Sequence, residues 1–142
     1  MNSMSLIFDA RSENEVFARC SGVAFLMPWN LSVEMLMEIK TVLAEAIVNA
    51  ILHGYKNAQK GKIKLEMSVD DDGLLTIVVE DQGEGMEDVL LAMTPMYTTR
   101  QDLERSGMGF TIMQSFLDEL EVVSAKGEGC RITGKKQLKR YG

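Results

Sequence analysis

Two runs of alternating apolar and polar residues, joined by a turn, constrain the fold of this chain more than any other feature. Residues 62–69 and 74–80 each place every second side chain on one apolar face, a period that is typical of a strand with one buried side. Asp71-Asp72-Gly73 between them is typical of a turn. We therefore predict an antiparallel hairpin. Its apolar faces consist of Ile63, Leu65, Met67 and Val69 on one strand and Leu75, Ile77 and Val79 on the other.

The residues before the hairpin predict one strand and two helices. Residues 4–8 have strand character, and Ser12-Glu13-Asn14-Glu15 has the spacing of a capping box, which predicts a helix that runs to about Met27 and is stopped by Pro28. The sequence does not decide which of two residues caps the second helix, because asparagine and serine are both good N-caps. The second helix is predicted to be capped by Asn30 or Ser32, to run to about Leu52 and to end at His53-Gly54.

The residues after the hairpin predict a third helix and a second hairpin. Gly107 or Gly109 opens the helix, which is predicted to run to about Leu120. Residues 121–125 and 130–135 then form the closing hairpin. Together these elements predict an α+β two-layer sandwich, with a mixed, mostly antiparallel sheet and its helices on one face.

Composition narrows the class of protein. The 142 residues, 46% hydrophobic and 25% charged, fit a single domain over residues 1–142. No apolar run reaches the roughly 20 residues that span a bilayer, and the net charge of −6 disfavours direct binding to nucleic acid. Cys20 and Cys130 are far apart and the chain has one histidine, so neither a disulfide framework nor a His-rich metal site is predicted, and a cytoplasmic location is expected.

The second predicted helix carries a carboxylate and an amide side by side. Glu45 and Asn49 are four residues apart and lie at the margin of the apolar arc of the helix. The amide oxygen of Asn49 is a suitable ligand for Mg²⁺, and the carboxylate of Glu45 is a suitable proton acceptor. An ordinary hydrogen-bonded or solvated pair at the helix boundary remains the alternative. The arc itself contains Met35, Ile39, Val42, Leu43, Ala46, Ile47 and Ala50.

Asp81 continues the apolar face of the second strand of the hairpin. A carboxylate at the end of a core-facing row needs hydrogen-bond donors. The backbone amides of Gly83 or Gly85 would make a structural turn, whereas the amino group of adenine would make a base-recognition site. The sequence leaves both interpretations open.

A glycine-containing turn precedes the third predicted helix, after a long loop over residues 82–106 that shows no periodicity. Ser106-Gly107-Met108-Gly109-Phe110 offers free backbone N–H groups at a helix start, which suit phosphate, although a flexible helix entry is the alternative. Hydroxyl and guanidinium groups just upstream suit polyphosphate oxygens, with surface charge as the alternative. These groups belong to Thr98, Thr99, Arg100 and Arg105.

The three elements together resemble a known superfamily. Glu45-x-x-x-Asn49, Asp81-x-Gly83-x-Gly85 and Gly107-x-Gly109 resemble the N, G1 and G2 boxes of the GHKL ATPases and kinases, which include gyrase, Hsp90, histidine kinases and MutL. Over roughly residues 4–135 the chain is similar to the anti-sigma-F factors, the serine kinases of spore-forming bacteria. The segments that carry this likeness are residues 10–15, 38–42, 53–55 and, most specifically, 103–113.

The resemblance implies a Bergerat ATP-binding fold that takes ATP or ADP with Mg²⁺. Glu45 would be the general base, Asn49 the Mg²⁺ ligand and Asp81 the acceptor for the adenine amino group. The remaining nucleotide contacts would come from Gly83, Gly85, Thr98, Thr99, Arg100, Arg105, Ser106, Gly107, Met108, Gly109, Phe110 and Cys130. Cys130 departs from the family, which usually has threonine there, and a thiol forms weaker hydrogen bonds than a hydroxyl.

The resemblance also implies partners. The protein would form a homodimer, bind and inhibit a sporulation sigma factor of the sigma-F type, and phosphorylate a serine of an anti-anti-sigma protein. Arg19 matches a partner-contact position of the family. No direct contact with nucleic acid or membrane is expected. The alternative is an ATP- or ADP-gated sigma-binding module of the general stress-response type, with little kinase activity.

Overall fold

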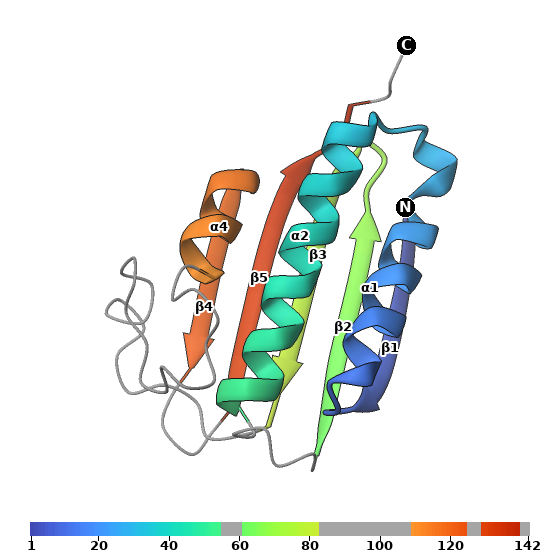
Figure 1. Cartoon of the computed structure of the whole chain (residues 1–142). Coiled ribbons are helices and arrows are strands. Elements are labelled where there is room, and N and C mark those ends of the chain that lie inside the picture. The colour runs from blue at the N-terminus through green and yellow to red at the C-terminus, as the bar shows by residue number, and fades with distance from the viewer. Residues whose placement is uncertain (55–60, 83–108, 125–128, 140–142) are drawn as a thin grey trace.

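The computed structural model describes residues 1–54, 61–82, 109–124 and 129–139, and these form an α+β sandwich of two layers (Figure 1). One layer is a five-stranded sheet in the order β1-β2-β3-β5-β4, and every neighbouring pair is antiparallel. The predicted α+β fold class is therefore confirmed, although the sheet is antiparallel throughout its described strands rather than mixed. The strands are β1 (Asn2–Asp9), β2 (Lys62–Val69), β3 (Leu74–Asp81), β4 (Glu119–Ser124) and β5 (Cys130–Gln137).

The second layer consists of helices on one face of the sheet (Figure 1). α1 lies over the β1 side, α2 over the middle and α4 over the β4 side. None of the helices in the described ranges is long and apolar enough to cross a bilayer. The elements are α1 (Glu13–Phe25), the 3₁₀ turn η1 (Met27–Trp29), α2 (Val33–Asn49), the π-helical turn η2 (Ala50–Gly54) and α4 (Gly109–Phe116).

The core lies between α2 and the inner face of the sheet. The predicted apolar arc of α2 supplies fully buried residues, and so do the alternating positions of β2 and β3, as the period of two requires. Gly22 allows α1 to approach α2 closely, because a Cβ there would lie 2.7 Å from a methyl carbon of Leu43. The largest fully buried side chains are Leu26, Ile39, Leu43, Ile47, Ile63, Leu65, Met67, Val69, Leu75 and Met113.

The predicted central hairpin is confirmed, with Leu65 opposite Val79. Its turn is stabilised by the carboxylate of Asp70, which accepts hydrogen bonds from the backbone N–H groups of Asp72 and Leu74, both at 2.9 Å. Gly73 has a φ of +83°, a conformation that favours glycine. The hairpin brings Asp81 to one end of the sheet with its backbone already paired.

The start of α1 differs from the prediction. Ser12 makes no side-chain cap, so the predicted capping box is wrong. The chain is held there by other contacts: Arg11 pairs with Glu13 at 2.9 Å, and the Asn14 amide donates to the carbonyl of Asp9 at 3.0 Å. Ser12 itself has a helical backbone, with φ −55° and ψ −39°, whereas a capping residue usually has an extended one.

The predicted end of the first helix and start of the second are refined by the structure. α1 ends at Phe25 rather than Met27, and Pro28 lies in η1. Of the two candidate caps for α2, Ser32 is the one used, because its hydroxyl accepts the N–H of Met35 at 3.1 Å. Asn30 instead has a left-handed backbone, with a φ of 48°.

α4 ends at Phe116, so the prediction of a helix that continues to Leu120 is wrong. Leu120 lies in β4. Lys136 of β5 donates to the carbonyl of Phe116 at 2.6 Å, and the N–H of Asp118 donates to Lys135 at 2.8 Å. These contacts satisfy groups at the helix end and turn the chain into the strand.

Candidate functional site

Four elements meet at one end of the sheet. β3 and β4 end there, β5 begins there, and the C-terminal end of α2 lies over the same end (Figure 1). η2 continues from α2 and contacts β3. The C-terminal residue of α4 contacts Lys136, near the opposite end of β5, so the N-terminal end of α4 is directed toward the end where β5 begins. The order of the elements therefore brings the predicted N-box helix and the predicted G1 strand together.

Glu45 and Asn49 lie on the last two turns of α2, and both are half-buried. Residues four apart share one side of a helix, and their neighbours Ala46, Ile47 and Ala50 are buried in the core. The predicted position of the pair, at the margin of the apolar arc, is thus what the structure has. A carboxylate and an amide are held side by side at the edge of the core.

Asp81 is buried, with 4% of its surface exposed, at the last position of β3. It lies opposite Ile63 of β2 on one side and Cys130 of β5 on the other. The alternation that buries Leu75, Ile77 and Val79 also turns Asp81 inward, as predicted. The structure thus brings two predicted site residues, Asp81 and Cys130, into direct cross-strand register.

The residue Cys130 is 6% exposed. Burial raises the pKa of this thiol to about 12, the negative charge of Asp81 acts in the same direction, and a side-chain hydrogen bond with Ser124 opposes both. The thiol is therefore protonated at neutral pH. It can act as a weak hydrogen-bond donor beside Asp81, but it is not a nucleophile.

Gly129 and Ser124 belong to the same place, and sequence reasoning assigned neither of them a role. Gly129 has a φ of +83°, and a Cβ on it would lie 2.2 Å from the backbone oxygen of Asp81. Ser124 donates from its hydroxyl to the carbonyl of Gly129 at 2.8 Å. The position of Gly129 directly before a predicted strand was a signal in the sequence. The role of Ser124 could be found only from the register between β4 and β5.

Of the remaining predicted nucleotide contacts, two are described by the structure and the others lie outside the described ranges. Gly109 and Phe110 begin α4, where Phe110 is 8% exposed and packs into the core. Phe110 therefore contributes to packing at the start of that helix. The residues outside the described ranges are Gly83, Gly85, Thr98, Thr99, Arg100, Arg105, Ser106, Gly107 and Met108.

Arg19 lies apart from this end of β5. It is on α1, over the β1 side of the sheet (Figure 1). Its Nε is 2.9 Å from a carboxylate oxygen of Glu15, and the two side chains are 24% and 14% exposed. Within the described part of the chain these two atoms have no hydrogen bond, so the pair is held by charge rather than by an aligned hydrogen bond. The structure does not bring Arg19 together with Asp81 and Cys130.

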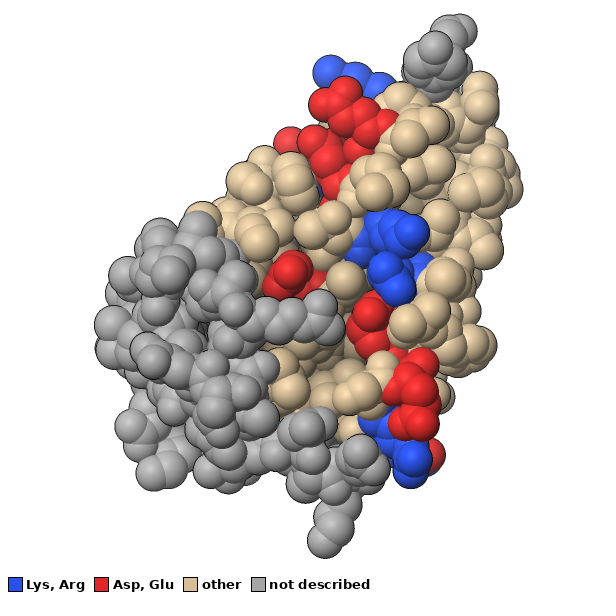
Figure 2. All heavy atoms as spheres, in the orientation of Figure 1, with Lys and Arg blue, Asp and Glu red and all other residues tan. Residues whose placement is uncertain are grey.

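The helix face carries charges of both signs. Figure 2 shows acidic and basic side chains interspersed among uncharged ones over α1 and α2. Among the described residues no continuous basic patch is visible on this face.

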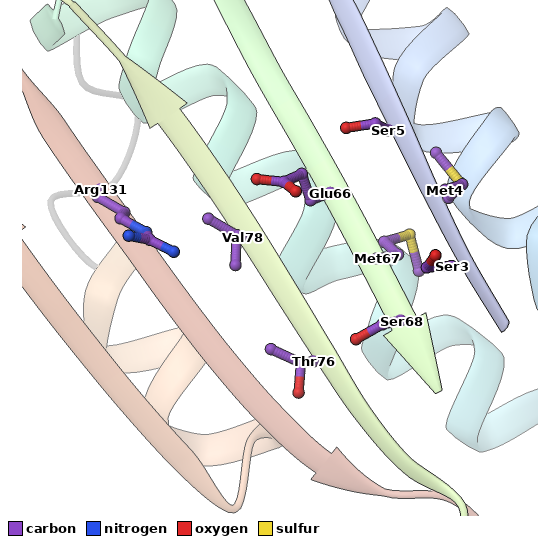
Figure 3. A pocket seen from close by; sticks show the side chains of 9 residues that line it. All are labelled: Ser3, Met4, Ser5, Glu66, Met67, Ser68, Thr76, Val78 and Arg131. Carbon is purple, nitrogen blue, oxygen red and sulfur yellow. The ribbon is translucent and has the colours of Figure 1, made fainter. Parts of the chain in front are cut away.

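A separate shallow hollow of about 290 Å³ lies on the outer face of the sheet (Figure 3). Its polar lining comes from outward-facing side chains of four strands, so the hollow opens on the side away from the helices. It is therefore distinct from the end of the sheet that holds Asp81. The polar lining residues are Ser3, Ser5, Glu66, Ser68, Thr76 and Arg131.

Comparison with known proteins identifies the fold family. A family model described as a histidine kinase-like ATPase domain matches residues 9–135. The chain belongs to this family. It is 46% identical over 138 residues to an anti-sigma F factor from Clostridium novyi (strain NT), covering 97% of this chain and 96% of that protein. It is 44% identical over 137 residues to an anti-sigma F factor from Priestia megaterium, covering 96% and 93%. The resemblance inferred from the three motifs is confirmed.

Solved structures show the same fold at low sequence identity. The crystal structure of the RsbU and RsbW domains of Rv1364c from Mycobacterium tuberculosis matches all of this chain with a TM-score of 0.72 and 17% identity, and this chain covers 34% of it. The catalytic domain of the histidine kinase ThkA matches with a TM-score of 0.59 and 15% identity, over 96% of both chains. These two solved structures thus share with this chain the fold of one sheet and one helical layer.

Proposed function

We propose that this protein is a cytoplasmic anti-sigma factor and an ATP-dependent protein serine kinase, built as one domain over residues 1–142. The observation that supports the proposal is that the end of α2, which carries Glu45 and Asn49, and the end of β3, which carries the buried Asp81, lie at the same end of the sheet. Membership of the ATPase family and 43–47% identity to anti-sigma F factors support it. A sigma factor of the sigma-F type would be the inhibited partner.

Asp81 and Cys130 would hold the base of ATP or ADP. The carboxylate of Asp81 accepts a hydrogen bond from the adenine amino group, and its burial makes that bond hard to replace by water. The Cys130 thiol lies beside it, protonated, as a weak donor. Backbone amides at residues 83, 85, 107 and 109, with the hydroxyl and guanidinium groups of the 98–106 segment, would contact the phosphates.

Asn49 would provide the protein ligand to Mg²⁺. Among the described residues no group of three His, Cys, Asp or Glu side chains could hold a metal ion, so the ion would depend on the Asn49 amide, phosphate oxygens and water. Bound Mg²⁺ would neutralise charge on the transferred phosphoryl group. Glu45, one helical turn before Asn49, would accept the proton of the attacking serine.

The substrate serine would belong to an anti-anti-sigma protein. The relatives named anti-sigma F factor support a sigma factor as the second partner. Arg19 would contribute to partner contact from α1, outside the nucleotide site. Assembly as a homodimer remains part of the proposal.

Phosphoryl transfer from γ-labelled ATP to a purified anti-anti-sigma protein, followed by mapping of the phosphorylated residue, tests the function. We expect one phosphoserine with the wild-type protein and a loss of roughly 100-fold or more in rate with Glu45→Gln. ATP affinity in that variant should change little, because Glu45 would accept the proton of the substrate serine and would not bind the adenine ring. Glu34→Gln, an exposed glutamate on the same helix, is the matched control. Equal rates of phosphoryl transfer for Glu45→Gln and wild type would refute the assignment of Glu45 as the general base.

A nucleotide-gated sigma-binding module is the second candidate. The separation of Arg19 on α1 from the Asp81 end of the sheet favours it, because two distinct sites are what gating requires. Sigma affinity measured with ATP, with ADP and without nucleotide tests this function. Affinity that is equal in all three states would exclude gating.

A further inference from the structure

Three polar side chains form one row across the end of the sheet. Asp81 of β3 lies opposite Cys130 of β5, and Cys130 lies opposite Ser124 of β4. Residues in direct register on neighbouring strands point to the same face. Asp81 and Cys130 are buried and Ser124 is partly buried, so the row continues inward-facing from the proposed base-binding carboxylate to the last residue of β4.

Ser124 holds the start of β5 in place. Its hydroxyl donates to the carbonyl of Gly129 at 2.8 Å, across the connection between β4 and β5. Ser124 also lies directly opposite Cys130 in the register of β4 and β5. One serine is therefore hydrogen-bonded to Gly129 and paired with Cys130, the two residues that lead β5 into the site.

Gly129 transmits that position to Asp81. A Cβ on Gly129 would lie 2.2 Å from the backbone oxygen of Asp81 and 3.0 Å from the Cα of Gln82. The two backbones therefore touch with no side chain between them. Since close-packed groups shift together, a change in the position of Gly129 also displaces Asp81.

We propose that Ser124 is a positioning residue for nucleobase recognition. By holding Gly129 and Cys130, Ser124 fixes the position of the Asp81 carboxylate. That carboxylate would accept a hydrogen bond from the 6-amino group of a purine. This inference rests on the proposed function, because it takes Asp81 to be the acceptor for the base. Ser124 does not itself contact the nucleotide in this arrangement.

The chemistry of position 6 provides a direct readout. The 6-amino group of adenine donates a hydrogen bond to a carboxylate, whereas the 6-oxo group of hypoxanthine presents an acceptor to the same oxygen. Inosine triphosphate shares its ribose and phosphates with ATP. The ratio of the two dissociation constants therefore reports the geometry of Asp81 and leaves out general effects on the fold or on phosphate binding.

The test is calorimetric titration of the full chain with ATP and with inosine triphosphate, each with Mg²⁺. In Ser124→Ala we expect the preference for ATP to fall by roughly threefold to tenfold, the range of one neutral hydrogen bond. Ser124→Thr keeps a hydroxyl and should keep the preference. Ser21→Ala is the matched control, because it removes a serine-to-carbonyl hydrogen bond of 2.9 Å on α1.

The outcomes separate the inference from the function. No binding of ATP by the wild type would overturn both. A wild-type preference for ATP that persists unchanged in Ser124→Ala would overturn the inference alone, and so would an equal weakening of both nucleotides. If Ser124→Ala does not fold, Ser124→Cys, kept reduced because it lies opposite Cys130, has nearly the same shape with a weaker donor. The same fall in preference is expected there, and an unchanged ratio overturns the inference.

Discussion

The buried thiol of Cys130 makes a measurable contribution to stability that depends on pH. The pKa of a cysteine thiol is 9.0 when unperturbed and about 12 in this folded protein. A pKa that is raised in the folded state stabilises the protein fully below pH 9, and this stability is lost as pH rises toward 12. The cause is that the unfolded chain can release the proton while the folded chain retains it.

The size of the effect follows from the two pKa values. Between pH 8 and pH 10 the unfolded thiol passes through its titration, whereas the folded thiol stays almost wholly protonated. Linkage then gives a loss of about 1.4 kcal/mol in the free energy of unfolding over this range. The 6% exposure of Cys130 means that solvent screens this difference little.

The assay is urea unfolding without nucleotide at pH 8, 9 and 10, for wild type and for Cys130→Ala. Other titrating groups affect both proteins alike, and the cavity left by alanine is the same at every pH. We therefore expect the wild type to lose about 1.4 kcal/mol relative to the variant. Cys20→Ser, which alters an exposed cysteine of α1, is the control and should run parallel to wild type. Parallel curves for Cys130→Ala as well would refute the reasoning, because they would mean that the thiol titrates equally in both states.

Two further predictions concern the ends of helices. Lys136→Met removes the donor to the carbonyl of Phe116 and the partner 3.3 Å from Glu38, and should lower the free energy of unfolding by about 1–3 kcal/mol, measured by urea unfolding. A variant as stable as wild type would show that the buried cation is dispensable. Ser32→Ala removes the N-cap of α2 and should lower the free energy of unfolding by about 1 kcal/mol, measured by thermal or urea unfolding. Ser12→Ala removes no side-chain cap and should lower the free energy of unfolding by less than half of that amount.

The parts of the fold that the sequence predicts are those set by periodicity. β2, β3 and the buried face of α2 follow from alternation and from the helical period, because burial on one side leaves a repeating apolar pattern. Asp81 was placed by the same reasoning, since it falls on the inward position after Val79. The position of Glu45 beside Asn49 followed from the spacing of four.

The parts that could not be predicted depend on residues distant in sequence. The carbonyl at the end of α4 is bonded by Lys136, 20 residues after Phe116, and no local sequence pattern indicates that contact. Ser12 has the residue type and spacing of a cap, but the contacts of Asn14 with β1 take its place. The roles of Ser124 and Gly129 need the register of β4, β5 and β3, which sequence alone does not give. The glycine turns and the predicted loop over residues 82–106 lie, apart from Gln82, outside the described residues and stay predictions.

The order of strands in the sheet also bears on how the chain is made. The central hairpin joins neighbours in sequence, but Leu6 of β1 pairs with Leu65 of β2. During synthesis on the ribosome, β1 therefore emerges roughly 60 residues before its partner, and pairings this distant are slow to form. Until β2 has been synthesised, the backbone groups of β1 cannot form the pairings that they make in the folded sheet. Ile7 of β1 is an exposed apolar side chain, and the strand that carries it can pair only after β2 has been synthesised.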